Sequence, residues 1–180
     1  VSKIAKTRYS SIEEALFALK DIQPKFIELI ETLFSTIDAF ILPENEQKSN
    51  FVDEQRITKS SRTQPAWSEI EILWQQVDVT IAHLESLIEN LTSSLSGLED
   101  KNIFDETLLV DIYNILERTR FFRIRISEII PDPGTDSIYW ASRSHRVGDI
   151  RLSKAPLHVG DILEKHLYSQ NKTIVLTSAT

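Results

Sequence analysis

Apolar residues recur at helical spacing through three long stretches of this 180-residue chain, and this periodicity constrains its fold most. In residues 65–97 the steps between successive apolar side chains alternate between four and three. This is the spacing of a helix that follows another helix along one seam. The seam consists of Ile70, Trp74, Val77, Ile81, Leu84, Ile88, Leu91 and Leu95.

An earlier helix is expected over residues 11–42. Ser11 and Glu14 have the spacing of a capping box, in which a hydroxyl and a carboxylate satisfy free backbone N–H groups at a helix start. Pro24 falls inside the apolar pattern, so we expect a kink or a break there. The polar residues 43–64 then predict an exposed loop.

A third helix is expected over residues 105–130, with Asp105 as its N-cap. The Pro131-Asp132-Pro133-Gly134 stretch ends it. A short turn joins it to the preceding helix, which predicts an antiparallel hairpin. Its expected seam is Leu108, Ile112, Ile115, Thr119, Phe122, Ile126 and Ile129.

The C-terminal part has a different pattern. Residues 137–141 and 149–152 resemble short strands, and residues 159–168 an amphipathic helix. The apolar run at residues 173–176 is typical of a buried strand in a parallel sheet. We therefore predict a mostly α, α+β chain, with a helical hairpin or bundle at residues 1–136 and a small α/β piece at residues 137–180.

Composition excludes several kinds of site. The chain has no cysteine, which excludes disulfides, thiolate zinc sites and iron–sulfur clusters within it. No metal site is expected, and no apolar run is long enough to predict a membrane span. Residues 1–117 carry 10 Lys and Arg against 21 Asp and Glu, a net charge of −11. Residues 118–180 carry 10 against 6, a net of +4, so only the second part has the cations that nucleic-acid binding needs.

Four arginines gather near the end of the third expected helix. Arg118 and Arg125 are expected on one flank of its apolar stripe, and Arg120 and Arg123 on the other. Arginine suits phosphate oxygens and base stacking, but it also forms ion pairs within a domain. Both explanations stay open. If these side chains bind DNA, Arg120→Glu with Arg123→Glu should weaken that binding.

The residues from Ser137 to Thr180 carry a family resemblance. Ala155-Pro156-Leu157, Val159-Gly160 and Ile162-Leu163 are followed by the run from Thr173 to Thr180, which reads Thr-Ile-Val-Leu-Thr-Ser-Ala-Thr. These phrases resemble the DinG/XPD-like branch of superfamily 2 DNA helicases, in the strand that ends in motif III. In this branch a helical Arch domain precedes that strand, and the three expected helices match it by type and position.

The resemblance implies a segment of an ATP-dependent, 5′-to-3′ DNA helicase acting on single-stranded DNA in the cytoplasm. Residues 1–136 would be the Arch-like domain, and residues 137–180 part of a RecA-like motor domain. Thr177, Ser178, Ala179 and Thr180 would couple ATP hydrolysis to unwinding. We therefore expect Ser178→Ala with Thr180→Ala in the full-length parent to keep ATP turnover and lose unwinding.

The motifs that hold ATP and Mg²⁺ are not found in this chain. By the resemblance they lie in the remainder of the motor, so the isolated segment is expected to be inactive, monomeric and free of cofactors. Whether the parent holds an iron–sulfur cluster stays open. The alternative is a non-enzymatic helical module that docks a partner through the seam at residues 70–95.

Overall fold

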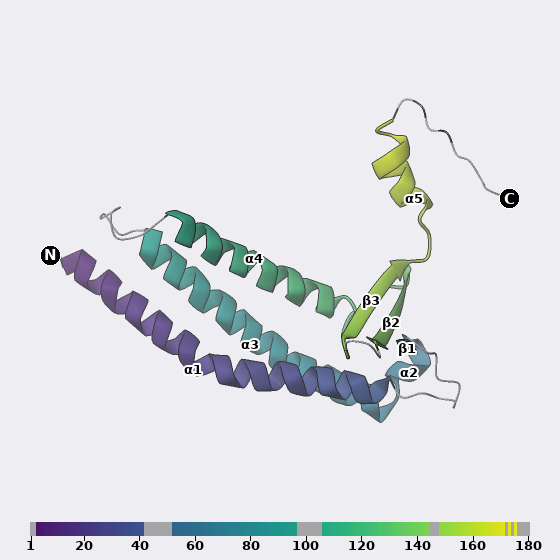
Figure 1. Ribbon diagram of the computed structural model, residues 1–180, viewed down its shortest axis with the longest axis horizontal. Coiled ribbons are helices and arrows are strands. Elements are labelled where there is room, and N and C mark those ends of the chain that lie inside the picture. The colour runs from purple at the N-terminus through teal and green to yellow at the C-terminus, as the bar shows by residue number, and fades with distance from the viewer. Residues whose placement is uncertain are drawn as a thin grey trace.

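The computed structural model describes residues 3–41, 52–96, 106–144, 148–171, 173 and 175. Its three long helices are α1 (Lys3–Phe40), α3 (Pro65–Ser96) and α4 (Glu106–Ser127). The mostly helical α+β class is confirmed, because one small antiparallel sheet accompanies these helices. The sheet lies near the end of the bundle where α1 ends and α3 begins (Figure 1).

Helix α3 lies between α1 and α4 and forms the centre of the bundle (Figure 1). It begins at Pro65, in the first turn where proline is favoured. Its predicted seam is confirmed over most of its length. Ile70, Trp74, Val77 and Ile81 are at most 2% exposed, and Leu91 and Leu95 are also buried. Helices α3 and α4 form the predicted antiparallel hairpin (Figure 1).

Helix α1 begins earlier than predicted. It starts at Lys3, so Ser11 lies inside the helix and does not cap it. The neighbouring Ser10 hydroxyl donates to Glu14 Oε1 at 3.1 Å. The helix continues through Pro24, and its axis bends partway along (Figure 1). Pro24 is exposed, so the backbone carbonyl that loses its hydrogen bond there can face water.

The predicted loop at residues 43–64 is wrong over its second half. Strand β1 (Val52–Ile57) and the short helix α2 (Lys59–Arg62) occupy it, whereas residues 42–51 lie outside the described residues. Ile57 is 5% exposed, but its neighbours in the strand are polar and largely solvent-facing. The strand was missed because it is held by pairing with β2, which a polar edge strand does not reveal in its own sequence.

The predicted seam of the third helix is wrong at Leu108 and Ile115, and it is confirmed at Ile112, Phe122, Ile126 and Ile129, which are buried or packed against the core. Leu108 and Ile115 are 43% and 55% exposed, whereas Leu116 is 3% exposed. Leu109 and Ile112 pack against Leu91, Leu95 and α1. The predicted N-cap Asp105 lies outside the described residues. Both faces of α4 carry large apolar residues, so spacing alone did not distinguish the packed face from the exposed one.

The sheet joins the helices in one core. Strand β2 (Ser137–Ser144) pairs with β1 on one side and β3 (Ile150–Pro156) on the other, both antiparallel, with Ile57 opposite Tyr139 and Ala141 opposite Leu152. Tyr139 and Ala141 belong to the same buried cluster as residues of α1 and α3. The core therefore crosses the boundary that the sequence predicted between residues 136 and 137.

The chain beyond β3 extends away from this core (Figure 1). Helix α5 (Gly160–Leu163) continues as a π-helical turn (Glu164–Tyr168), close to the helix predicted at residues 159–168. The strand predicted at residues 173–176 is wrong at both positions that the structure describes, since Thr173 and Val175 are not in a strand and Val175 is 81% exposed. A buried strand needs neighbouring strands, and none of the described strands pairs with these residues.

Candidate nucleic-acid interface

Helix α4 carries all four arginines that the sequence singled out. Leu116 and Ile126 are buried against the bundle and fix the rotation of the helix. Helix geometry then directs Arg120 and Arg123 towards α3 and leaves Arg118 and Arg125 on the outer side. The predicted grouping of the arginines into two pairs corresponds to an inner and an outer pair.

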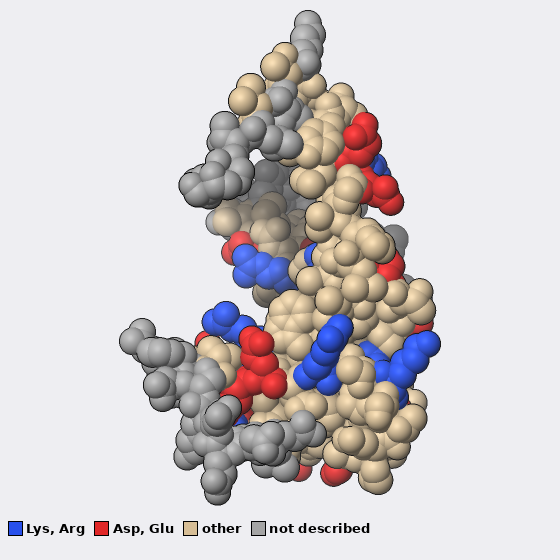
Figure 2. Space-filling view, turned by 90° about the vertical axis from the view of Figure 1, so that its right-hand side faces the viewer, with Lys and Arg blue, Asp and Glu red and all other residues tan. Residues whose placement is uncertain are grey.

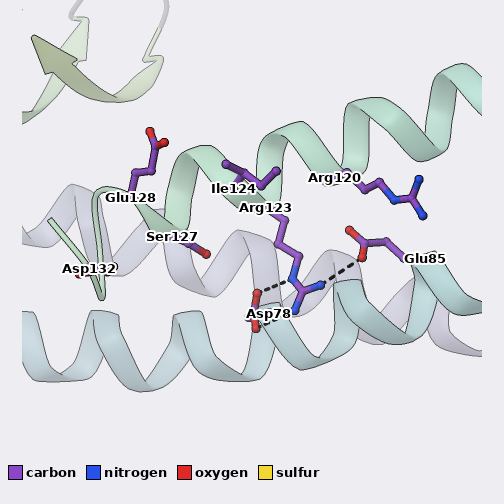
Figure 3. A pocket seen from close by; sticks show the side chains of 8 residues that line it. All are labelled: Asp78, Glu85, Arg120, Arg123, Ile124, Ser127, Glu128 and Asp132. Carbon is purple, nitrogen blue, oxygen red and sulfur yellow. Dashed lines mark hydrogen bonds and ion pairs between the residues drawn. The ribbon is translucent and has the colours of Figure 1, made fainter. Parts of the chain in front are cut away.

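Arg123 is held by two carboxylates of α3 (Figure 3). Its Nε lies 2.6 Å from Asp78 Oδ1 and its Nη2 lies 3.2 Å from Asp78 Oδ2, while Nη1 lies 3.1 Å from Glu85 Oε2. The side chains of Arg123 and Glu85 are 33% and 13% exposed. The hydrogen bond to Asp78, followed by the charges of Asp78 and Glu85, raises the pKa of Arg123 above its ordinary value.

Arg120 is also paired with carboxylates. It forms ion pairs with Glu89 of α3 and, at 2.9 Å, with Glu117 of its own helix. The hydrogen bond with Glu117 raises the pKa of Arg120. The inner pair thus joins α4 to the acidic side of α3, and its charges are already neutralised.

The groove around the inner pair is a hollow of about 500 Å³. Its lining contains more carboxylates than arginines, and Glu85 Oε1 is buried there without a hydrogen-bond partner among the described residues. An acidic lining repels phosphate, so this groove does not suit a nucleic-acid strand. Its lining residues are Asp78, Glu85, Arg120, Arg123, Ile124, Ser127, Glu128 and Asp132 (Figure 3).

The outer face of α4 has the opposite character. The Arg125 guanidinium lies 4.9 Å from the centre of the Phe121 ring, and Phe121 is 60% exposed. Among the described residues, Arg125 has one ion pair, a long one at 3.8 Å to Glu128, and its side chain is 58% exposed. Arg118 is exposed and forms no ion pair with any residue that the structure describes. Tyr113, on the same helix, is 52% exposed.

These outer residues combine the two groups that bind single-stranded nucleic acids. Arginines neutralise phosphates, and exposed aromatic rings stack on bases of any sequence. The predicted candidates Arg118 and Arg125 belong to this face, together with Phe121. Arg120 and Arg123 do not.

The other predicted site is the motif-III tetrapeptide. Thr177, Ser178, Ala179 and Thr180 lie outside the described residues. Within the described ranges there is no cluster of His, Asp and Glu that could hold a metal ion. Among the helices described here, none combines the length and the apolar character needed to cross a membrane.

Two arginines that the sequence did not single out connect distant segments. Arg62 donates to the carbonyl oxygens of Ile130 and Ile129 at 2.7 and 2.6 Å, and burial lowers its pKa. Arg143 bonds Asp38 at 2.9 Å and Asp53 at 3.0 Å, and the bond to Asp53 raises the pKa of Arg143. These partners are 67 to 105 residues away along the chain, so no local pattern could have revealed them.

Comparison of the chain with protein-family models, with curated proteins and with solved structures finds no match.

Proposed function

We propose that this chain is a segment of an ATP-dependent, 5′-to-3′ DNA helicase that supplies an Arch-like helical domain and the motif-III coupling residues. The observation that carries the proposal is the order of phrases between Ala155 and Thr180, which resembles the DinG/XPD-like helicases. A long helical bundle before these phrases agrees with an Arch-like insertion. ATP and Mg²⁺ would bind the remainder of the motor, and the enzyme would act in the cytoplasm.

In this proposal single-stranded DNA contacts the outer face of α4, defined by Arg118, Phe121 and Arg125. Phosphates would lie against the two guanidinium groups, and a base would stack on the exposed Phe121 ring. The inner pair, Arg120 and Arg123, holds α4 on α3 instead. Arg120→Glu with Arg123→Glu would therefore act on DNA binding only through the stability of the bundle.

The outer face is tested with a charge-reversed variant. Arg118→Glu with Arg125→Glu should weaken binding of a fluorescein-labelled oligothymidylate by about tenfold or more, because two phosphate contacts are lost and two repulsions are added. Fluorescence anisotropy at two salt concentrations measures the affinity and its salt dependence. A matched control is Lys20→Glu with Lys25→Glu, two exposed cations on α1.

Equal weakening in both variants would indicate only a general charge effect and would remove the α4 face from the proposal.

The coupling role of Ser178 and Thr180 depends on the resemblance alone. Unchanged unwinding by the full-length parent carrying Ser178→Ala and Thr180→Ala would contradict that role.

The alternative function, a module that docks a partner through residues 70–95, has less support. The seam is covered by α1 and α4 of the same chain, so a partner would first have to displace one of them. A stable dimer in sedimentation experiments would favour the module, and a monomer favours the internal bundle.

A further inference from the structure

The sheet has an inner and an outer face, and Trp140 lies on the outer one. Tyr139 and Ala141 of β2 are 4% and 0% exposed and belong to the buried cluster that includes residues of α1 and α3. Successive side chains of a strand point to opposite faces, so Trp140, between these two, points away from that cluster. Trp140 is partly exposed and belongs to neither cluster of buried residues in the described part of the chain. The largest aromatic side chain of the sheet is thus left out of the core.

The two edge strands place arginines beside this ring. Arg56 of β1 and Ser153 of β3 are the direct partners of Trp140 across the strands, and directly paired residues lie on the same face. Arg151 pairs with Ser142 in the next row, which makes it a diagonal neighbour of Trp140 on that face. Trp140 therefore has an arginine on each side, whereas the small Ser153 leaves the ring accessible.

Both arginines are available to a ligand. Arg56 is exposed and forms no ion pair with any residue in the described ranges. Arg151 is 70% exposed, and it pairs with the exposed Asp149 only at 3.7 Å. Such surface pairs contribute little and are easily exchanged for another anion. Glu54 is the one carboxylate that the strand register places on this face, so the arginines outnumber it.

This combination suits a nucleic-acid strand with unpaired bases. An aromatic ring stacks on a base of any sequence, and arginines beside it neutralise the phosphates. The other large apolar side chains of the face, Val52 and Ile138, lie towards its opposite ends, so the face lacks the wide apolar patch that marks a protein interface. Figure 2 views the molecule from the side on which the sheet lies in Figure 1, and several Lys and Arg side chains are separated there by uncharged surface.

We propose that Arg56, Trp140, Arg151 and Ser153 form a second contact surface for single-stranded DNA, which we call the sheet platform. A base would stack on the Trp140 ring, and the two guanidinium groups would contact the phosphates on either side of it. The inference rests on the proposed DNA-binding function. It does not rest on the outer face of α4, because the two surfaces belong to different elements.

Intrinsic fluorescence tests the platform directly. The chain has three tryptophans, and Trp67 and Trp74 are 0% and 2% exposed, so a stacked base can quench only Trp140. Oligothymidylate should therefore quench part of the fluorescence in a saturable way, and Trp140→Phe should abolish this quenching. A hairpin duplex of the same length should not quench, because its bases are already stacked on one another. No saturable quenching by oligothymidylate, or equal quenching by the duplex, would overturn the proposal.

The stacking role is tested by affinity. Anisotropy of a fluorescein-labelled oligothymidylate should show binding about fivefold weaker or more in Trp140→Leu, which keeps apolar bulk but loses the aromatic face. Trp140→Phe keeps an aromatic ring and should bind within about twofold of the wild-type protein. Equal affinities of these two variants would overturn the stacking role.

The arginines are tested with a charge-matched pair of variants. Arg56→Gln with Arg151→Gln should weaken binding by about fivefold or more and reduce its salt dependence, because two phosphate contacts are lost. Lys20→Gln with Lys25→Gln removes the same charge from exposed positions of α1 and should have little effect. Equal weakening in the two variants would overturn the role of Arg56 and Arg151.

The α4 variant separates failure of the platform from failure of the proposed function. In Arg118→Glu with Arg125→Glu, oligothymidylate should still quench Trp140 at saturation, but at higher concentrations. Binding that depends on Arg118 and Arg125 without any quenching would overturn the platform and leave the DNA-binding function in place. Quenching at unchanged concentrations in this variant would support the platform and overturn the α4 face.

Discussion

At the residue scale, the pairing of a charged side chain decides what it can do. Arg123 and Arg125 are two residues apart on one helix and have the same chemistry. Arg123 contacts two carboxylates, Asp78 and Glu85, whereas Arg125 lies over an exposed ring and forms a long ion pair with Glu128. The paired guanidinium of Arg123 stabilises the bundle, whereas that of Arg125 is available to phosphate.

Replacing Arg123 therefore tests stability. Arg123→Ala should lower the free energy of unfolding by about 1–3 kcal/mol, because Asp78 and the largely buried Glu85 lose their counter-charge. Arg118→Ala should change it by less than about 0.5 kcal/mol, since an exposed side chain with no ion pair among the described residues contributes little. Urea denaturation followed by tryptophan fluorescence measures both. Equal effects of the two substitutions would contradict the division into inner and outer arginines.

At the element scale, α4 is a helix with two apolar faces. Leu116 faces the bundle, whereas the adjacent Ile115 is 55% exposed. The other large apolar residues that α4 leaves exposed are Leu108, Val110, Tyr113, Phe121 and Ile124. Hydrophobic spacing alone therefore does not predict which face of such a helix packs against the bundle.

Two adjacent truncations check this rotation. Leu116→Ala should cost about 2–4 kcal/mol of unfolding free energy, because it leaves a cavity in the bundle. Ile115→Ala should cost less than about 1 kcal/mol, since its side chain is already largely hydrated. Chemical denaturation of both variants gives the comparison. The seam predicted from the sequence contains Ile115 and not Leu116. A larger loss of unfolding free energy in Ile115→Ala than in Leu116→Ala would therefore support that seam.

At the scale of the whole molecule, the sheet and the helices share a core. Residues from α1, α3, β1 and β2 belong to one buried cluster, and Arg143 connects β2 to Asp38 and Asp53. Residues 157–167, by contrast, are all exposed. The cooperative unit should therefore end near residue 156.

Two shortened chains test this extent. A chain ending at residue 156 should unfold cooperatively at nearly the temperature of the full chain. A chain ending at residue 136 should lose cooperative unfolding, because Tyr139 and Ala141 are removed from the core. Circular dichroism melting curves compare them. Cooperative melting of the shorter chain would instead support a separate domain at residues 1–136.

The sequence by itself determined the elements whose signal is local. The seam of α3 repeats over many turns, and the Pro-Gly stretch that follows α4 stops a helix whatever surrounds it. Most of the helical fold and the two-by-two grouping of the α4 arginines could therefore be predicted. These features depend on neighbours within a few residues.

Tertiary structure decided the rest. Strand β1 exists because β2 lies beside it, and the apolar run at Thr173 and Val175 is not a strand because no described strand pairs with it. Arg120 and Arg123 turned inward because α3 presents Asp78, Glu85 and Glu89 to them, 31 to 45 residues away. A pocket of about 340 Å³ likewise lies between residues 56–62 and residues 133–139. Strand pairing, ion pairing and pocket formation all depend on contacts between distant segments, which local spacing does not encode.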